Sequence, residues 1–260
     1  MLSNNGGGDV EWEECETKGI TMIKLTINGK LVEVAESATI LMAASKAGID
    51  IPTLCFNEEL APAGACRLCV VEAAMGEKLA LVTACDNPVS EGMVVSTDSP
   101  KALEARRVAA EILLAQSPTS KKLQHIASRL GLEKPRFTLP ANECILCRQC
   151  TRACQEVVGA GAISFITRGL GREVEPRVVF DTERCIACGS CAYVCPTDAI
   201  KLNDANGKRT IATPSGKMEF GLKACAHCGF FFAPEKQLAY MARKADLPQE
   251  KFDKCLDCRE

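Results

Sequence analysis

Hydrophobic and polar positions alternate from Met22 to Ile27, which is typical of a β-strand with one buried face. Asn28-Gly29 follows directly and favours a type I′ turn, because both residues tolerate a positive φ. The alternation resumes over 31–35. The pattern therefore predicts a β-hairpin in this part of the chain.

A short helix is expected after the hairpin. Ser37 or Thr39 can cap its first turn, and Gly48 can end it after Ala47. Hydrophobic runs between turn residues predict three further strands: 70–74, 78–84 and 93–96. This order of hairpin, helix, loop and strands predicts a β-grasp domain over 22–98.

Two amphipathic helices are expected next. Ser99 can cap the first helix, with Pro100 in its first turn. The second helix begins after Ser120 and should stop at Gly131. Its apolar stripe consists of Leu123, Ile126 and Leu130. The region 99–139 is therefore predicted to be a helical bridge that packs between cluster-binding domains.

The second half of the chain contains an internal repeat of one cysteine spacing. With short strands expected at 163–166 and 177–180, this repeat predicts a domain over 140–210. A further module over 220–260 combines two Cys-x2-Cys pairs with an expected helix from Pro234 to Ala245. The chain is therefore predicted to be a multi-domain α+β protein.

Charge and hydropathy exclude several classes of protein. The net charge is −2 and no strongly basic stretch occurs, so nucleic acid is not expected as a partner. No apolar run reaches the roughly 18 residues that a membrane span needs. Residues 1–21 are polar, acidic and glycine-rich, which predicts a flexible tail and no secretion signal. A cytoplasmic protein with reduced thiols is expected.

Cysteine makes up 17 of the 260 residues. A secreted disulfide framework is one interpretation of such a count, but bunched Cys-x2-Cys pairs suit metal ligation better. Twelve of the cysteines fall into three sets whose spacing is typical of iron–sulfur ligands. Cys15 belongs to no set and is interpreted as a spectator thiol.

The first cysteine set consists of Cys55, Cys66, Cys69 and Cys85. Three cysteines on or beside one loop with a fourth downstream are typical of a [2Fe–2S] cluster, although the first gap is longer than in plant-type ferredoxins. Ala63, Gly64 and Ala65 fit a backbone wrapped on a cluster, where amide groups can bond sulfur. A four-cysteine zinc site is the alternative for this set.

The next two runs both have the spacing Cys-x2-Cys-x2-Cys-x3-Cys, in which the fourth cysteine of each run ligates the other of two clusters. The second set, predicted to hold one [4Fe–4S] cluster, is Cys144, Cys147, Cys150 and Cys195. The third set, predicted to hold another [4Fe–4S] cluster, is Cys154, Cys185, Cys188 and Cys191. Pro196 matches the ferredoxin signature, whereas Gln155 departs from it.

The fourth set lies in the C-terminal module and consists of Cys225, Cys228, Cys255 and Cys258. Such a set can bind a zinc ion, which would stabilise a domain too small to have a large core. A further iron–sulfur cluster and free thiols are the alternatives. His227 is not needed as a ligand, because four cysteines already complete the site. Phe230 to Phe232 are interpreted as local core.

No catalytic residue is predicted in this chain. There is no Gly-x-Gly-x-x-Gly fingerprint in a strand-to-helix context, so a dinucleotide site is not expected. The two histidines, His125 and His227, offer little for acid–base chemistry. Bound clusters would instead supply one-electron chemistry, while the protein spaces them and tunes their potentials.

From Met22 to about Leu202 the chain resembles a family of iron–sulfur subunits that includes the N-terminal region of the large cluster subunit of complex I. The same modules occur in the diaphorase small subunit of bidirectional hydrogenases and in the N-terminal region of multimeric [FeFe] hydrogenases. Two segments carry the resemblance most clearly: Pro62-Ala63-Gly64-Ala65-Cys66-Arg67-Leu68-Cys69 and Ala84-Cys85-Asp86-Asn87-Pro88-Val89-Ser90-Glu91-Gly92-Met93.

One departure from this family is informative. In much of the family, a motif of one histidine and three cysteines holds another [4Fe–4S] cluster after the first domain. Here Ser117 stands where that histidine would be, and no cysteine occurs between Cys85 and Cys144. The fourth set is an addition relative to complex I. The resemblance therefore points to a shortened variant, as in NADH-linked hydrogenase, formate dehydrogenase or electron-bifurcating transhydrogenase complexes of anaerobes.

The resemblance implies an electron-transfer subunit of a cytoplasmic, multi-subunit NAD(P)-dependent oxidoreductase. It would pass single electrons between a flavin- and NAD(P)-binding subunit and either ferredoxin or a catalytic hydrogenase or formate dehydrogenase subunit. A stand-alone polyferredoxin is the alternative. A redox or metal sensor is a third interpretation, which lacks an accompanying DNA- or effector-binding module.

Overall fold

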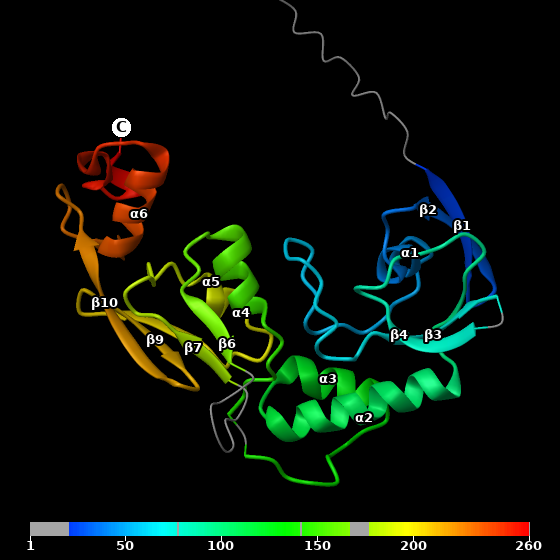
Figure 1. Cartoon of the computed structure of the whole chain (residues 1–260). Coiled ribbons are helices and arrows are strands. Elements are labelled where there is room, and N and C mark those ends of the chain that lie inside the picture. The colour runs from blue at the N-terminus through cyan, green and yellow to red at the C-terminus, as the bar shows by residue number, and fades with distance from the viewer. Residues whose placement is uncertain (1–20, 77, 141, 167–176, 260) are drawn as a thin grey trace, which may run out of the picture.

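The computed structural model describes residues 21–76, 78–140, 142–166 and 177–259. The elements form successive modules, with the N-terminal sheet and the C-terminal sheet at opposite sides of the molecule and helices α2 and α3 between them (Figure 1). The predicted multi-domain α+β class is confirmed. Cys15 and the rest of the predicted tail, except Thr21, lie outside the described residues.

A five-stranded sheet with the order β2-β1-β5-β3-β4 forms the N-terminal module. Its strands are β1 (Met22–Ile27), β2 (Lys30–Ala35), β3 (Val70–Met75), β4 (Lys78–Thr83) and β5 (Val94–Ser96). The predicted turn at Asn28-Gly29 is confirmed, with φ values of 48° and 79°. β1 pairs in parallel with β5, which places Thr26 opposite Val94 and joins the hairpin to the later strands.

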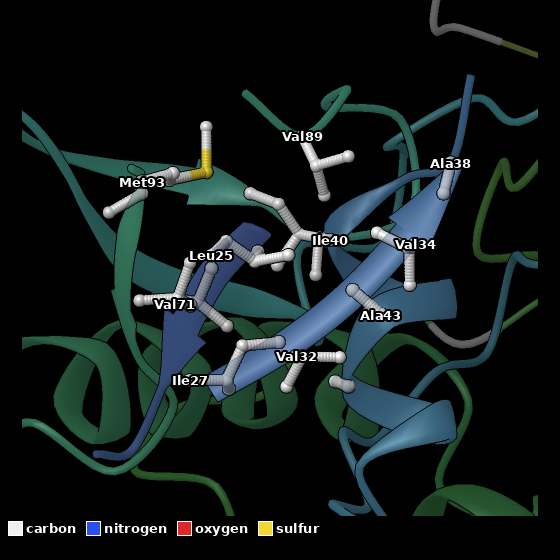
Figure 2. Packing of buried hydrophobic residues seen from close by; sticks show 14 of the residues in the cluster. Leu25, Ile27, Val32, Val34, Ala38, Ile40, Ala43, Val71, Val89 and Met93 are labelled. Carbon is white, nitrogen blue, oxygen red and sulfur yellow. The ribbon is translucent and has the colours of Figure 1, made fainter. Parts of the chain in front are cut away.

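Helix α1 (Ile40–Lys46) covers one face of this sheet. Its cap is Thr39, whose hydroxyl accepts a hydrogen bond from the N–H of Met42 at 3.3 Å. Figure 2 shows Ile40 of the helix among the sheet residues Leu25 and Val34. Burying a side chain such as Leu25 or Ile40 contributes about 1.5–3 kcal/mol. The loop that leaves α1 carries three cysteines of the first set, Cys55, Cys66 and Cys69.

The two predicted bridge helices are confirmed as α2 (Pro100–Gln116) and α3 (Lys121–Arg129). Their predicted caps are also confirmed. The Ser99 hydroxyl accepts from the N–H of Ala102 at 3.2 Å, and the Ser120 hydroxyl accepts from the N–H of Leu123 at 3.4 Å. Each serine satisfies a backbone donor that the first turn of a helix would otherwise leave unpaired.

Apolar residues of both helices pack in one buried cluster with cysteines of two different modules. The helices contribute Ala110, Leu114, Leu123 and Ile126, and the cysteines are Cys55, Cys66 and Cys147. The loop of the first cysteine set and the loop of the second set therefore share one core, which fixes their relative positions.

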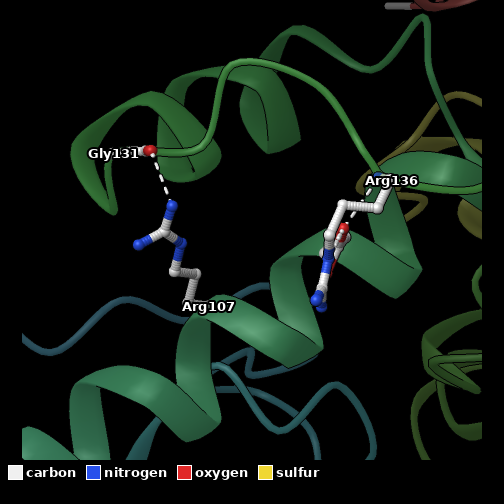
Figure 3. Close-up of polar contacts among 4 residues, drawn as sticks. Arg107, Gly131 and Arg136 are labelled. Atoms are coloured by element: carbon white, nitrogen blue, oxygen red, sulfur yellow. Dashed lines mark hydrogen bonds and ion pairs between the residues drawn. The ribbon is translucent and has the colours of Figure 1, made fainter.

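Polar contacts tie the segment after α3 back to α2 (Figure 3). Arg107 donates to the carbonyl of Gly131 at 3.5 Å, and the Arg136 guanidinium donates to the Glu111 carboxylate at 2.6 and 2.8 Å. These hydrogen bonds from Arg136 lower the pKa of the Glu111 carboxyl from 4.5 to about 2. The pair therefore stabilises the folded state above the unfolded pKa of 4.5, and this contribution is lost as the pH falls towards 2.

The next module surrounds the second and third cysteine sets. The two predicted strands are confirmed as β6 (Ile163–Ile166) and β7 (Arg177–Phe180), which pair antiparallel. Three short helical segments accompany them: α4 (Gln149–Arg152), the π-helical turn η1 (Ala153–Val157) and α5 (Ser190–Tyr193). α4 and α5 contain the third cysteine of their respective runs, Cys150 and Cys191.

A four-stranded antiparallel sheet, with the order β11-β10-β9-β8, follows this module and was not predicted from the sequence. Its strands are β8 (Lys201–Ala205), β9 (Lys208–Thr213), β10 (Gly216–Ala224) and β11 (Phe231–Pro234). Ile211 and Phe220 of this sheet pack in the core around the third set. β10 and β11 continue into the C-terminal module, so one sheet supports both metal-binding regions.

The C-terminal module contains α6 (Glu235–Ala245) at the predicted position, followed by η2 (Gln249–Phe252) and η3 (Leu256–Cys258). The interpretation of Phe230 to Phe232 as local core is wrong for the first two residues. Phe230 is 64% exposed and Phe231 is 48% exposed. Phe231 lies over the turn at Gly207, and the small core under α6 accommodates only Phe232 of the three.

None of the helices in the described ranges has the length and apolar character that crossing a membrane requires.

Candidate metal centres

The first cysteine set lies together inside the N-terminal module. Cys55, Cys66 and Cys69 come from the loop between α1 and β3, and Cys85 follows β4. All four side chains are buried. The N–H of Cys66 donates to Sγ of Cys55 at 3.4 Å. One loop and one strand end therefore supply four sulfur atoms to a single site.

The thiols of this set hydrogen-bond one another, and their pKa values diverge as a result. The Cys66 thiol lowers the pKa of Cys55 to about 2, and the Cys85 thiol lowers the pKa of Cys69 to about 7. The same contacts raise the pKa values of Cys66 and Cys85. Four thiolates this close together require positive charge between them, which a metal cluster supplies.

Gly64 is required by the packing beside this site. Its φ is +53°, and a Cβ there would collide with the carboxylate of Asp86 and approach the Thr83 hydroxyl to 3.2 Å. The backbone N–H of Gly64 hydrogen-bonds the sulfur of Cys85. Glycine thus permits a left-handed turn that both avoids Asp86 and directs an amide to a ligand atom.

The second cysteine set lines one small cavity in the next module. Cys144, Cys147 and Cys150 come from the first run, whereas Cys195 comes from the end of the second run. Apolar side chains complete the walls: Ile145, Val178, Phe180 and Ile200.

The third cysteine set lines a separate small cavity. Cys185, Cys188 and Cys191 come from the second run, and Cys154 reaches the cavity from the first run. Cys154 lies on the π-helical turn, and its Sγ accepts a hydrogen bond from the N–H of Ala162 at 3.3 Å. The last cysteine of each run therefore lies at the cavity of the other run.

The backbone repeats the same ligand loop at both cavities. Leu146 and Ala187 occupy equivalent places two residues after Cys144 and Cys185, with φ values of 56° and 59°. The N–H group of each hydrogen-bonds the sulfur of that preceding cysteine. Non-glycine residues rarely adopt this conformation, and they do so where the backbone must direct its amides to a ligand.

Burial controls the charge of these cysteines. Desolvation raises the pKa values of three of them to about 12: Cys147, Cys150 and Cys191. As free thiols they would be neutral at physiological pH. Their thiolate forms therefore need a bound cation, and four sulfurs around an apolar cavity fit a four-iron cluster.

Ser117, at the sequence position of the family's histidine ligand, is fully buried and forms a hydrogen bond with a glutamate. Its hydroxyl donates to Oε2 of Glu143 at 2.6 Å. The backbone carbonyl of Glu143 also accepts from the hydroxyl of Thr197 at 2.6 Å. These bonds join the end of α2 to both ends of the second cysteine set, because Glu143 precedes Cys144 and Thr197 follows Cys195.

The fourth cysteine set is brought together at the C-terminal end. The Sγ atoms of its four cysteines all lie within 4.8 Å of one another, and those of Cys228 and Cys255 are 3.8 Å apart. Backbone N–H groups of Cys228 and Cys255 lower the pKa of the Cys225 thiol to about 6. His227 is exposed and lies outside this group of four cysteines.

These distances bear on the kind of metal. A tetrahedral zinc ion with Zn–S bonds of about 2.3 Å holds its sulfurs about 3.8 Å apart. A four-iron cluster holds its cysteine sulfurs further apart, because each sulfur is bonded to a different iron atom. The close packing of the fourth set therefore fits a single ion better than a cluster.

Three residues that the sequence analysis missed connect the first and second sets. Gln149 donates to the carbonyl of Leu54 at 2.8 Å, and the Glu156 carboxylate accepts from the N–H of Ala61 at 2.9 Å. Arg152 donates to the backbone carbonyl of Cys55 at 2.9 Å. No sequence motif signals these contacts, since their partners are backbone atoms almost 100 residues away in the chain.

Two surface cavities lie next to the cysteine sets. The apolar hollow, of about 1000 Å³, reaches Cys85 and is lined by Leu41, Met42, Ile49, Phe56, Leu60 and Pro62. Lys46, Asp50 and Glu58 also line it. The basic groove, of about 530 Å³, reaches Cys185 and is lined by three cationic residues: Arg184, Lys236 and Arg243. Glu183 is the acidic residue of this groove.

The family described as "2Fe-2S iron-sulfur cluster binding domain" matches residues 21–100. Two families described as "4Fe-4S dicluster domain" match residues 143–199 and 177–233. Together with the cavities above, these matches define the class of the protein: an iron–sulfur protein with a 2Fe-2S domain followed by 4Fe-4S dicluster domains.

Relatives of the chain carry the same modules within longer proteins. The chain is 34% identical over 204 residues to the NADPH-Fe(3+) oxidoreductase subunit alpha of Geobacter sulfurreducens, and the match covers 69% of the chain. It is 37% identical over 214 residues to the NADP-reducing hydrogenase subunit HndD of Solidesulfovibrio fructosivorans, covering 70% of the chain. It is 32% identical over 259 residues to a subunit of the NADH-quinone oxidoreductase of Rhizobium meliloti, covering 89%.

The chain spans only 24%, 36% and 29% of these relatives, in the same order. A solved structure of an NAD+-reducing [NiFe]-hydrogenase in the H2-reduced state aligns with a TM-score of 0.52 at 28% identity. This alignment covers 61% of the chain and 74% of that protein chain. The predicted resemblance to the large cluster subunit of complex I and its hydrogenase relatives is thereby confirmed.

Proposed function

We propose that this chain is the iron–sulfur electron-transfer subunit of an NAD(P)-linked oxidoreductase complex. The observation that carries the proposal is that the first three cysteine sets are linked in succession by shared structural elements. The loops of the first and second sets share one core, and Cys150 and Cys154 of the second and third sets lie on one continuous helical segment. Such a succession suits the movement of single electrons through the protein.

In this proposal the first set holds a [2Fe–2S] cluster, and the second and third sets each hold a [4Fe–4S] cluster. Bound clusters would supply the one-electron chemistry. The chain would hold them in buried, apolar surroundings and directs amide groups such as that of Gly64 to the ligand sulfurs.

A flavin- and NAD(P)-binding subunit is the proposed partner at the apolar hollow. This hollow is large, predominantly apolar and next to Cys85 of the first set. Permanent subunit interfaces are more hydrophobic than transient ones. Such a partner would exchange a hydride with NAD(P)H and pass its two electrons, one at a time, to the site beside the hollow.

An acidic one-electron carrier of the ferredoxin class is the proposed partner at the basic groove. α1, which borders the apolar hollow, and α6, which borders the groove, lie at opposite sides of the molecule (Figure 1). Charge complementarity speeds the encounter of transient partners, and a groove lined by Arg184, Lys236 and Arg243 attracts an acidic surface. A hydride carries two electrons, so two carriers would be reduced for each hydride that the flavin-binding subunit takes from NAD(P)H.

The proposal for the specific complex is based on the chain's departures from the family that it resembles. Ser117, which stands at the sequence position of the family's histidine ligand, is buried and donates to Glu143 instead, which favours a shortened electron path. We therefore place the chain with electron-bifurcating transhydrogenase, formate dehydrogenase or hydrogenase complexes, in which a ferredoxin or a catalytic subunit is the far partner. The alternative is a stand-alone polyferredoxin.

Purification of the tagged chain from its native cells distinguishes these two functions. We expect a flavoprotein subunit to copurify in a fixed ratio, and NADH or NADPH to bleach the iron–sulfur absorbance of the complex. A chain that elutes alone, with all its clusters, and is not reduced by either nucleotide would instead support the polyferredoxin.

The basic groove gives a second test. The double variant Arg184→Glu/Arg243→Glu should slow electron exchange with an acidic ferredoxin by roughly tenfold or more at low salt, since electrostatic steering commonly accelerates association by this factor. Lys236 is left in place because its ammonium group also donates to the carbonyls of Thr182 and Glu183. Stopped-flow rates at two salt concentrations measure the effect.

The matched control for the groove is Lys121→Glu/Lys122→Glu, which reverses two exposed charges on α3. This variant should keep the native rate with ferredoxin. The groove variant should keep its iron content and its rate with a small neutral acceptor. Equal ferredoxin rates in the groove variant and the native protein would contradict docking at the groove.

A further inference from the structure

One short helical segment contacts all three predicted cluster sites. α4 continues into the π-helical turn η1, so that residues 149–157 form a single element. Cys150 and Cys154 of this element line the cavities of the second and third sets. Gln149, Arg152 and Glu156 bind the loop of the first set. Their spacing of three and four residues is that of one helix face.

Arg152 is the residue of this element whose side chain contacts the ligand loops of both the first and the second set. Its Nη2 donates to the backbone carbonyl of Cys55 at 2.9 Å and also lies 3.4 Å from the backbone carbonyl of Cys147. Its Nη1 donates to the carbonyl of Ala61. One guanidinium group therefore joins a cysteine of the first set to a cysteine of the second set.

The guanidinium of Arg152 donates its hydrogen bonds to backbone carbonyl groups. Among the described residues, no aspartate or glutamate forms an ion pair with it, and its Nε is buried without a hydrogen-bond partner. A half-buried cation favours negative charge nearby. A cluster held by either of the ligand loops that Arg152 contacts would add negative charge beside it.

We propose that Arg152 couples the first and second sites, by joining their ligand loops and by raising the reduction potentials of both centres. This inference rests on the cluster assignment proposed above. An electron added to either centre increases its negative charge, which the guanidinium stabilises, and the net charge around a cluster is one of the factors that set its potential. The route from Cys55 to Cys147 through the guanidinium consists only of covalent and hydrogen bonds.

Arg152→Gln in the cluster-loaded full chain tests the proposal. Potentiometric EPR should show a shift of the [2Fe–2S] cluster and of the second-set [4Fe–4S] cluster to more negative potentials. The third-set cluster should shift less, because the guanidinium donates to backbone groups of the loops of the first and second sets. The magnetic interaction between the first two reduced centres should also weaken, because the hydrogen-bonded route from Cys55 to Cys147 through the guanidinium is lost.

Arg152→Lys separates charge from geometry. Lysine keeps the positive charge but lacks the planar fork that joins two carbonyl groups. We expect it to retain more of the native potentials than Arg152→Gln while still weakening the magnetic interaction. Arg129→Gln is the matched control, since it removes an exposed arginine of α3 that pairs with Asp50. It should leave both readouts unchanged.

The iron content and EPR signals show whether an outcome contradicts the role of Arg152 or the cluster assignment. Arg152→Gln and Arg152→Lys proteins with full iron, native potentials and native magnetic interaction would overturn the role of Arg152 alone. A native chain without the two-iron or four-iron EPR signals would overturn the cluster assignment instead. If Arg152→Gln fails to fold, the Arg152→Lys protein still tests the coupling through its magnetic interaction.

Discussion

Cys154→Ala and Cys195→Ala should each remove one four-iron cluster, and each should remove the cluster of the opposite run. Cys154 is the last cysteine of the first run, but it lines the cavity of the third set, whose other cysteines come from the second run. Cys195 is the last cysteine of the second run, but it lines the cavity of the second set, whose other cysteines come from the first run. The iron content should fall from about ten per chain to about six in either variant, by the stoichiometry of one two-iron and two four-iron clusters. Metal analysis measures this loss.

EPR spectroscopy shows which of the two clusters is lost. The second-set cluster adjoins the two-iron site, because Cys55, Cys66 and Cys147 share one packed core. Cys195→Ala should therefore abolish the magnetic interaction with the two-iron centre, whereas Cys154→Ala should preserve it. The two-iron signal itself should remain in both variants.

The controls for this experiment come from the same chain. Cys15→Ala changes a cysteine outside every set and should keep about ten irons, by the same cluster stoichiometry. If each run held its own cluster, the outcomes of Cys154→Ala and Cys195→Ala would be exchanged. That result would contradict the interleaved ligand sets. A fall to about two irons in both variants would instead mean that the two four-iron sites fold only as a unit, by the same cluster stoichiometry.

Removal of the C-terminal metal should unfold the module from Cys225 to Cys258. The described core of this module has three buried apolar residues, Leu238, Ala242 and Phe252. Fully burying a large apolar side chain contributes about 1.5–3 kcal/mol, whereas structural zinc contributes about 10–16 kcal/mol in small zinc-binding peptides. A bound zinc ion would therefore dominate the stability of this part of the protein.

Cys225→Ser is the variant that removes this metal most directly, since Cys225 is buried and accepts a hydrogen bond from the N–H of Cys255 at 3.3 Å. We expect one zinc per native chain and none in the variant. Hydrogen exchange should become fast in α6 and around η2, while the iron content stays near ten by cluster stoichiometry. His227→Ala is the control and should retain the zinc.

Two results would contradict the single-ion assignment. About fourteen irons and no zinc in the native chain would make the fourth set a further four-iron cluster, by cluster stoichiometry. A zinc-free Cys225→Ser chain with native hydrogen exchange in α6 would show that the module does not depend on a metal.

The sequence predicted local elements well where capping or turn chemistry is strong. Asn28-Gly29 identified the first hairpin, and Ser99 and Ser120 identified the starts of both bridge helices. Asn206-Gly207 carries the same hairpin signal, with φ values of 52° and 72°, but was not used to predict β8 and β9. That sheet was missed because β8 is exposed along its whole length, so its hydrophobic pattern is weak.

The cysteine sets themselves were determined by the sequence. Ligands of one metal site must come from short loops of fixed length, because the backbone has to wrap around the metal and direct its amides to the sulfurs. That requirement leaves a spacing visible in the chain, and the repeat extends to the left-handed positions Leu146 and Ala187. The Cys-x2-Cys spacing left the metal of the fourth set open, and the sulfur separations in the folded chain favour a single ion.

Only the tertiary structure decided how the sites are joined. Gln149, Arg152 and Glu156 bind backbone groups of the loop at 54–61, and Ser117 binds Glu143 across the helical bridge. Backbone carbonyl and amide groups are the same in every residue, so contacts to them leave no signature in a sequence. The sequence by itself therefore predicted which cysteines form each set. The packing of α4 against a loop almost 100 residues away decided that the second set lies beside the first.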